Sequence, residues 1–176
     1  MKISKVFLIG VYVHLTLFVC AIFVMKLSVV LAFLWIAVYL LVCLSVMVLG
    51  WVTVGASIVT SRRGRYDELR RSWRFLKLGT IPFFVANFVC CFMWSLVMVV
   101  MPPAMLLFFL LPVLFACQLI IQSGCIGVVY IHYLCGLYRE KTPGAIHYFL
   151  QFIPVLDVVS TLIVLKKYEE VTVQEA

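Results

Sequence analysis

The residues best able to do chemistry in this chain are a few polar side chains within long apolar segments. Asp157 is the only acidic residue inside such a segment. A carboxylate within a membrane could bind a cation, relay a proton or orient a histidine. The structural alternative is that Asp157 caps a helix that resumes at Val158, or pairs with Lys166 or Arg139. The sequence leaves both interpretations open.

The histidines are the other titratable candidates. His147 and Gln151 are four residues apart and therefore share a helical face. If the last apolar segment folds back, His132, His147 and Asp157 converge, and they could bind a divalent metal or shuttle protons. No spaced metal-binding motif is present, so hydrogen bonds to the backbone are the simpler interpretation. We predict no metal and no cofactor. For His14, near the middle of the first apolar segment, we expect a hydrogen bond across a helix contact.

A second group of polar residues consists of amides beside small residues. Gln118 and Gln122 are again four residues apart, close to Gly124 and Gly127. Small residues let helices approach closely, and glutamines can form hydrogen bonds across the contact. Asn87 is a candidate partner on the preceding segment. We interpret this set as helix-packing contacts, and the alternative is a polar permeation path.

The elements that must position these side chains are long apolar segments. Hydrophobic residues make up 66% of the chain, and the mean hydropathy is +1.20, which excludes a soluble globular protein and a disordered chain. The segments reach or exceed the roughly 20 residues that a bilayer-crossing helix needs, and in lipid such segments satisfy their backbone only as helices. We predict an all-α, polytopic transmembrane bundle, a single integral membrane domain over residues 1–176. Its four spans are expected at about 6–25, 27–59, 78–101 and 104–135.

The last apolar segment, residues 145–165, is ambiguous. It has the length of a span, but Pro154 interrupts it. With a cytoplasmic N-terminus and four spans, every Lys and Arg except Lys26 is cytoplasmic, whereas a fifth span would move Lys166 and Lys167 outside. We therefore favour a re-entrant or interfacial helix–break–helix, with a fifth span as the alternative. A re-entrant segment requires that its broken backbone face protein or water.

The most basic stretch, residues 61–77, lies between the second and third predicted spans. Its apolar residues recur at spacings of 3, 4 and 3: Tyr66, Leu69, Trp73 and Leu76. This stripe predicts a short amphipathic cytoplasmic helix lying on the inner leaflet. Its basic side chains would contact anionic lipid headgroups, each contributing about 1 kcal/mol near the surface. They are Arg62, Arg63, Arg65, Arg70, Arg71, Arg74 and Lys77. The alternative is an ordinary solvated loop.

No catalytic signature stands out in the chain. It has no G-x-S-x-G elbow, P-loop or Gly-rich dinucleotide fingerprint, and no pair of carboxylates placed for general acid–base chemistry. We expect a non-enzymatic accessory or scaffold subunit in the cytoplasmic membrane, packed against copies of itself or a larger complex. The alternatives are a protomer of a small-solute or ion transporter or channel, and a membrane enzyme with a cytoplasm-facing His/Asp centre. Because the basic residues border apolar spans, we attribute the net charge of +7 to membrane topology and expect no nucleic-acid partner.

Overall fold

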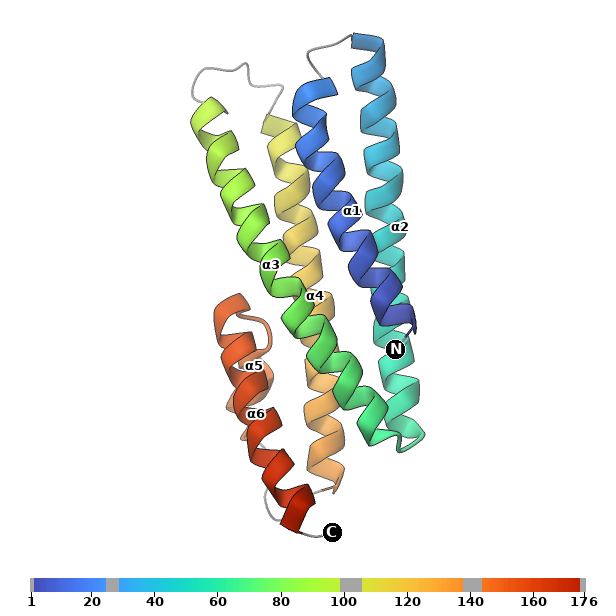
Figure 1. Cartoon of the computed structure of the whole chain (residues 1–176), viewed down its shortest axis with the longest axis vertical. Helices are drawn as coiled ribbons and strands as arrows, with labels where there is room; N and C mark the ends of the chain where they lie inside the picture. Colours follow the sequence, from blue (N-terminus) through green and yellow to red (C-terminus); the bar gives the residue numbers. More distant parts are fainter. Residues whose placement is uncertain (1, 25–28, 99–105, 138–143, 175–176) are drawn as a thin grey trace. The chain divides into compact units, whose positions relative to one another are not determined.

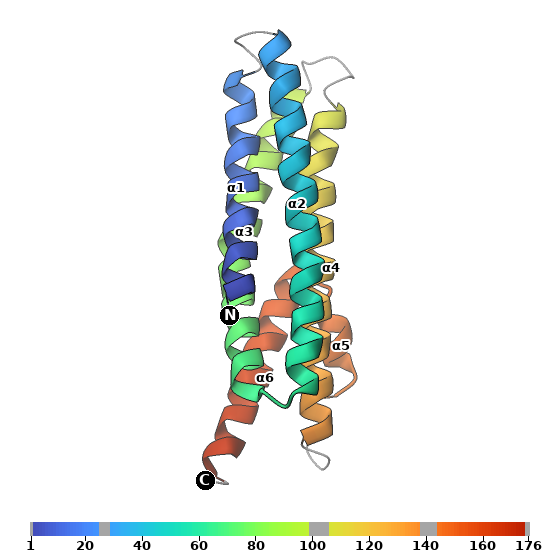
Figure 2. The ribbon, with the colours of Figure 1, turned by 90° about the vertical axis from the view of Figure 1, so that its right-hand side faces the viewer.

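The described part of the chain is built from α-helices. The computed structural model describes residues 2–24, 29–98, 106–137 and 144–174. Figure 1 traces the helices in chain order, and Figure 2 shows them turned by 90°. They are α1 (Lys2–Val24), α2 (Val29–Arg62), α3 (Tyr66–Met98), α4 (Leu106–Leu137), α5 (Ile146–Leu150) and α6 (Pro154–Gln174). The predicted all-α fold class is confirmed.

Four of these helices are long and apolar enough to cross a membrane. The qualifying stretches are Lys2–Ala21 of α1, Val30–Arg62 of α2, Tyr66–Met93 of α3 and Leu110–Gly136 of α4. Each overlaps one of the four predicted spans, so the described part of the chain has four candidate transmembrane helices. The predicted span ends within residues 25–28 and 99–105 lie outside the described residues.

The third helix begins earlier than the sequence predicted. The expected amphipathic helix and the span after it are one element, because α3 runs unbroken from Tyr66. Only the turn at residues 63–65 separates it from α2, with Gly64 in the left-handed region at φ 68°. The physical reason is that buried positions keep recurring at helical spacing on one face of α3, from Leu69 and Trp73 as far as Phe83. The helix therefore does not end where the composition changes.

Contacts divide the chain into two compact units, which we describe separately. Of the described residues, the first unit contains 54–78, 120–137 and 144–174, and the second contains 2–24, 29–53, 79–98 and 106–119. Helices α2, α3 and α4 each contribute one portion to each unit. Helices α5 and α6 belong entirely to the first unit.

The second unit has an aromatic core around a buried histidine. His14 of α1 is 0% exposed, and its Nε2 lies 2.7 Å from the hydroxyl of Tyr39 on α2. The imidazole stacks on Phe115 of α4, with ring centroids 3.7 Å apart. Phe83 of α3 packs edge-on against the same Phe115 ring. His14 therefore makes the hydrogen bond across a helix contact that the sequence predicted.

The segment after α4 is interrupted before Pro154, but the helix resumes at Pro154 itself rather than at the expected Val158, because proline fits the first turn of a helix, and Asp157 therefore lies within α6 and does not cap it. Helix α5 ends at Leu150, residues 151–153 form a turn, and α6 begins at Pro154. Helix α6 extends beyond the predicted boundary at residue 165, to Gln174. Both views place α5 and α6 beside the end of α4 within the first unit (Figure 1 and Figure 2).

Candidate functional site

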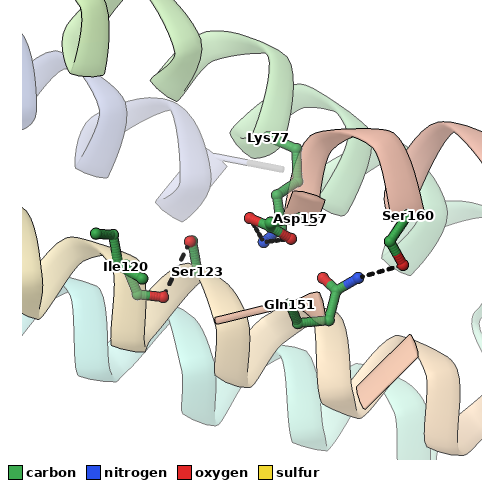
Figure 3. A network of polar contacts seen from close by, with 6 residues as sticks. All are labelled: Lys77, Ile120, Ser123, Gln151, Asp157 and Ser160. Carbon is green, nitrogen blue, oxygen red and sulfur yellow. Dashed lines mark hydrogen bonds and ion pairs between the residues drawn. The ribbon is translucent and has the colours of Figure 1, made fainter. Parts of the chain in front are cut away.

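A buried ion pair joins α3 to α6 in the first unit. The Lys77 ammonium lies 2.6 Å and 2.5 Å from the two carboxylate oxygens of Asp157, and the two residues are 2% and 6% exposed. Figure 3 shows the two side chains pointing toward one another. Burial raises the pKa of the Asp157 carboxyl, and the Lys77 ammonium opposes that shift. Either charge left alone in this position would be strongly destabilising, so each residue depends on the other.

Helical spacing explains why both charged residues are buried. Lys77 follows the buried Trp73 by four residues on α3, and Asp157 precedes the buried Ser160 by three residues on α6. Asp157 also lies in the first turn of α6, where a carboxylate interacts favourably with the helix dipole. The two inward faces meet, and the opposite charges compensate each other there.

Next to the ion pair, Ser160 of α6 links this helix to α5 and to the turn that follows α5. Its hydroxyl oxygen lies 2.8 Å from Nδ1 of His147 on α5 and accepts a 3.3 Å hydrogen bond from Nε2 of Gln151. Ser160 and Gln151 are fully buried, and His147 is half-buried. These three side chains hold α5 and the turn against α6, and Figure 3 shows the contact between Gln151 and Ser160.

Two glycines of α4 let the turn between α5 and α6 approach closely. A Cβ atom on Gly127 would lie 1.9 Å from Oε1 of Gln151, and one on Gly124 would lie 3.0 Å from the Gln151 carbonyl oxygen. The first distance is far below any real Cβ contact, so glycine is required at position 127 if Gln151 keeps its place. The small residues predicted to permit close helix packing therefore do so, against the last segment of the chain.

The three residues of the predicted His/Asp centre have different surroundings. Asp157 pairs with Lys77, His147 contacts Ser160, and His132 is exposed on α4. Within residues 2–24, 29–98, 106–137 and 144–174, no group of three His, Cys, Asp or Glu side chains is placed to hold a metal ion.

The predicted amide cluster is divided between the two units. Gln122 is buried in the first unit, whereas Asn87 is buried and Gln118 half-buried in the second. Among the described residues, no hydrogen-bond partner is found for Oδ1 of Asn87. The expected contact between Asn87 and the glutamines stays a prediction.

The basic side chains around the start of α3 do not share one environment, because most are exposed and Lys77 is buried. Lys77 was expected from its charge to contact lipid headgroups, but it is buried on the inward face of α3. Arg65 forms a 3.1 Å ion pair with the exposed Glu68. The arginines that remain at the surface are Arg62, Arg63, Arg65, Arg71 and Arg74, with Arg70 half-buried. Lys77 was not predicted from the sequence as the partner of Asp157.

Comparison with known proteins identifies a family without identifying an activity. Residues 2–170 match a protein family described as a family of unknown function, DUF6652. No curated protein matches the chain, and no solved structure does.

Proposed function

The chain belongs to the DUF6652 family, and we propose that it is a small, non-enzymatic, multi-pass accessory or scaffold subunit of a membrane complex. One observation carries this proposal: polar side chains of the first unit pair with one another between helices. Lys77 pairs with Asp157, and Ser160 contacts both Gln151 and His147. Side chains engaged in this way stabilise helix packing in membranes, which is the use expected in a structural subunit.

We further propose that the protein lies in the cytoplasmic membrane with its N-terminus in the cytoplasm. With four spans, this orientation leaves only Lys26 of the Lys and Arg residues outside, in keeping with the positive-inside rule. Helices α5 and α6 are then a re-entrant or interfacial element on the cytoplasmic side. The close approach of Gln151 to Gly124 and Gly127 supports this, because irregular backbone at membrane depth must face protein or water.

One observation favours a second function, that of a small-solute or ion transporter or channel protomer. Transporters place substrate and ion sites at broken helices, and Asp157 lies in the first turn after the break between α5 and α6. Lys77 already neutralises this carboxylate. A transported cation would therefore have to displace the Lys77 ammonium.

Flux measurements in proteoliposomes separate the two functions. The wild-type protein and the Lys77→Met/Asp157→Leu double variant are reconstituted at equal density, with an imposed H⁺, Na⁺ or K⁺ gradient and an internal dye that responds to the same ion. A structural subunit is expected to pass ions no faster than protein-free liposomes do. A wild-type flux that the folded double variant lacks would establish transport instead.

Chemical crosslinking in native membranes tests the subunit role itself. A tagged chain that belongs to a homo-oligomer or a larger complex is expected to appear in crosslinked bands well above its own 20.1 kDa. Migration of the whole population as a monomer, at crosslinker levels that capture a known neighbouring complex, would contradict the proposal.

A further inference from the structure

The exposed face of α2 changes from apolar to basic within one helical turn. Ile58 and Val59 are 39% and 47% exposed near the end of the helix. Arg62, the last residue of α2, is exposed four residues after Ile58 on the same face, and the exposed Arg63 follows it in the turn. In a helix that crosses a membrane, exposed aliphatic side chains contact acyl chains. The two arginines therefore lie just beyond the hydrocarbon region.

On α3 the exposed face changes in the opposite direction, from basic to apolar along the chain. Arg71 and Arg74 are exposed in its early turns, and the exposed Leu78 follows Arg74 by four residues on the same face. Seven residues further along this face, Val85 is 60% exposed. Arg74 and Leu78 therefore mark the boundary between polar and apolar surroundings on α3.

The turn at residues 63–65 joins these two boundaries. Both arginine pairs belong to the first unit, Arg62 and Arg63 where α2 meets the turn, and Arg71 and Arg74 in the early turns of α3. We propose that Arg62, Arg63, Arg71 and Arg74 form a binding site for the phosphate groups of anionic phospholipids. The lipids belong to the leaflet whose acyl chains cover Ile58 and Leu78.

Charge and side-chain chemistry determine what this surface binds. A guanidinium group donates two parallel hydrogen bonds to a phosphate, and its apolar stem lies along the acyl region. The nearby acidic residues do not neutralise the surface, since Glu68 pairs with Arg65 and Asp67 is a single charge beside four arginines. Lys77 is excluded from the site by its ion pair with Asp157. The inference depends only on the membrane-crossing helices, so it holds for either proposed function.

Native mass spectrometry of the purified full chain tests the site. The protein in detergent is mixed with equal amounts of dioleoyl phosphatidylglycerol and dioleoyl phosphatidylcholine, and the retained lipids are counted. Each basic residue near an anionic surface contributes about fivefold in affinity. We therefore expect wild type to retain phosphatidylglycerol at least tenfold over phosphatidylcholine. The R62Q/R63Q/R71Q/R74Q variant should lose that preference.

Two further variants make the result specific to the site. Lysine at the same four positions preserves the charge and should retain most of the preference. A matched control replaces basic residues elsewhere with glutamine and removes the same charge: Lys2, Lys5, Lys166 and Lys167. Elution volume in size exclusion verifies that every variant is folded.

Three outcomes would overturn the inference. Wild type without a preference for the anionic lipid would show that the surface is not a phospholipid site. An equal loss in the matched control would show that net charge, rather than these arginines, determines lipid retention. Displacement of the lipid by inorganic phosphate or glycerol phosphate would identify a soluble phosphate compound as the ligand.

Discussion

Replacing Gly127 with alanine tests how closely the last two helices pack against α4. The added methyl carbon would lie 1.9 Å from Oε1 of Gln151, whereas ordinary contacts begin at 3.4 Å. The Gln151 amide must therefore withdraw by about 1.5 Å or adopt another rotamer. Either change disturbs the geometry of the hydrogen bond that it donates to Ser160.

The expected loss of stability follows from these contacts. The hydrogen bond from Gln151 to Ser160 contributes about 0.5–1.5 kcal/mol, and forcing a methyl group into a filled contact costs about 1–3 kcal/mol. Together they give roughly 1.5–4.5 kcal/mol, and the preference of alanine over glycine in a helix offsets up to about 1 kcal/mol of it, for a net loss of roughly 1–4 kcal/mol. For a chain of this size, this lowers the melting temperature by roughly 2–16 °C.

Gly136 provides a matched control on the same helix. A Cβ atom there meets nothing within 4 Å, so Gly136→Ala should keep or raise stability, because alanine favours a helix over glycine by up to about 1 kcal/mol. Both variants are heated in detergent, and the monodisperse fraction is measured by size exclusion. Equal melting temperatures for the two variants would refute the close approach of Gln151 to α4.

Two further substitutions test other polar contacts by the same thermal assay. Tyr39→Phe removes the hydroxyl that pairs with the buried His14 and should cost about 1–3 kcal/mol; an unchanged melting temperature would show that the imidazole does not need this partner. Ser160→Ala removes the contacts with His147 and Gln151 and should cost a similar amount. Ser45→Ala should change little, since its hydroxyl is exposed and bonds only within its own helix, and an equal loss in the two serine variants would contradict the linking role of Ser160.

The four spans could be predicted because each is a long apolar run, a property of local sequence. The second expected span, residues 27–59, differs from Val30–Arg62 by three residues at each end. The residue at which α3 begins was predicted less accurately. The composition changes near residue 77, but the backbone hydrogen bonds of a helix continue across such a change when the buried face stays in phase.

Lys77 shows that charge alone does not predict whether a side chain is exposed or buried. Its basic character groups it with the neighbouring arginines, although its spacing from Trp73 places it on the buried face. Its partner, Asp157, is 80 residues away along the chain. The sequence offered the nearer Lys166 and Arg139 instead, because a contact between distant segments leaves no local pattern in one sequence.

The pairing of Lys77 with Asp157 is the central claim, and a double-mutant cycle measures it most directly. Thermal and chemical unfolding are compared for wild type, Lys77→Met, Asp157→Leu and the double variant. Each single variant leaves a buried charge without its partner and should lose about 3–5 kcal/mol, whereas the double variant should be close to wild type in stability. If the single losses simply add in the double variant, to within about 0.5 kcal/mol, the two residues do not pair and the claim fails.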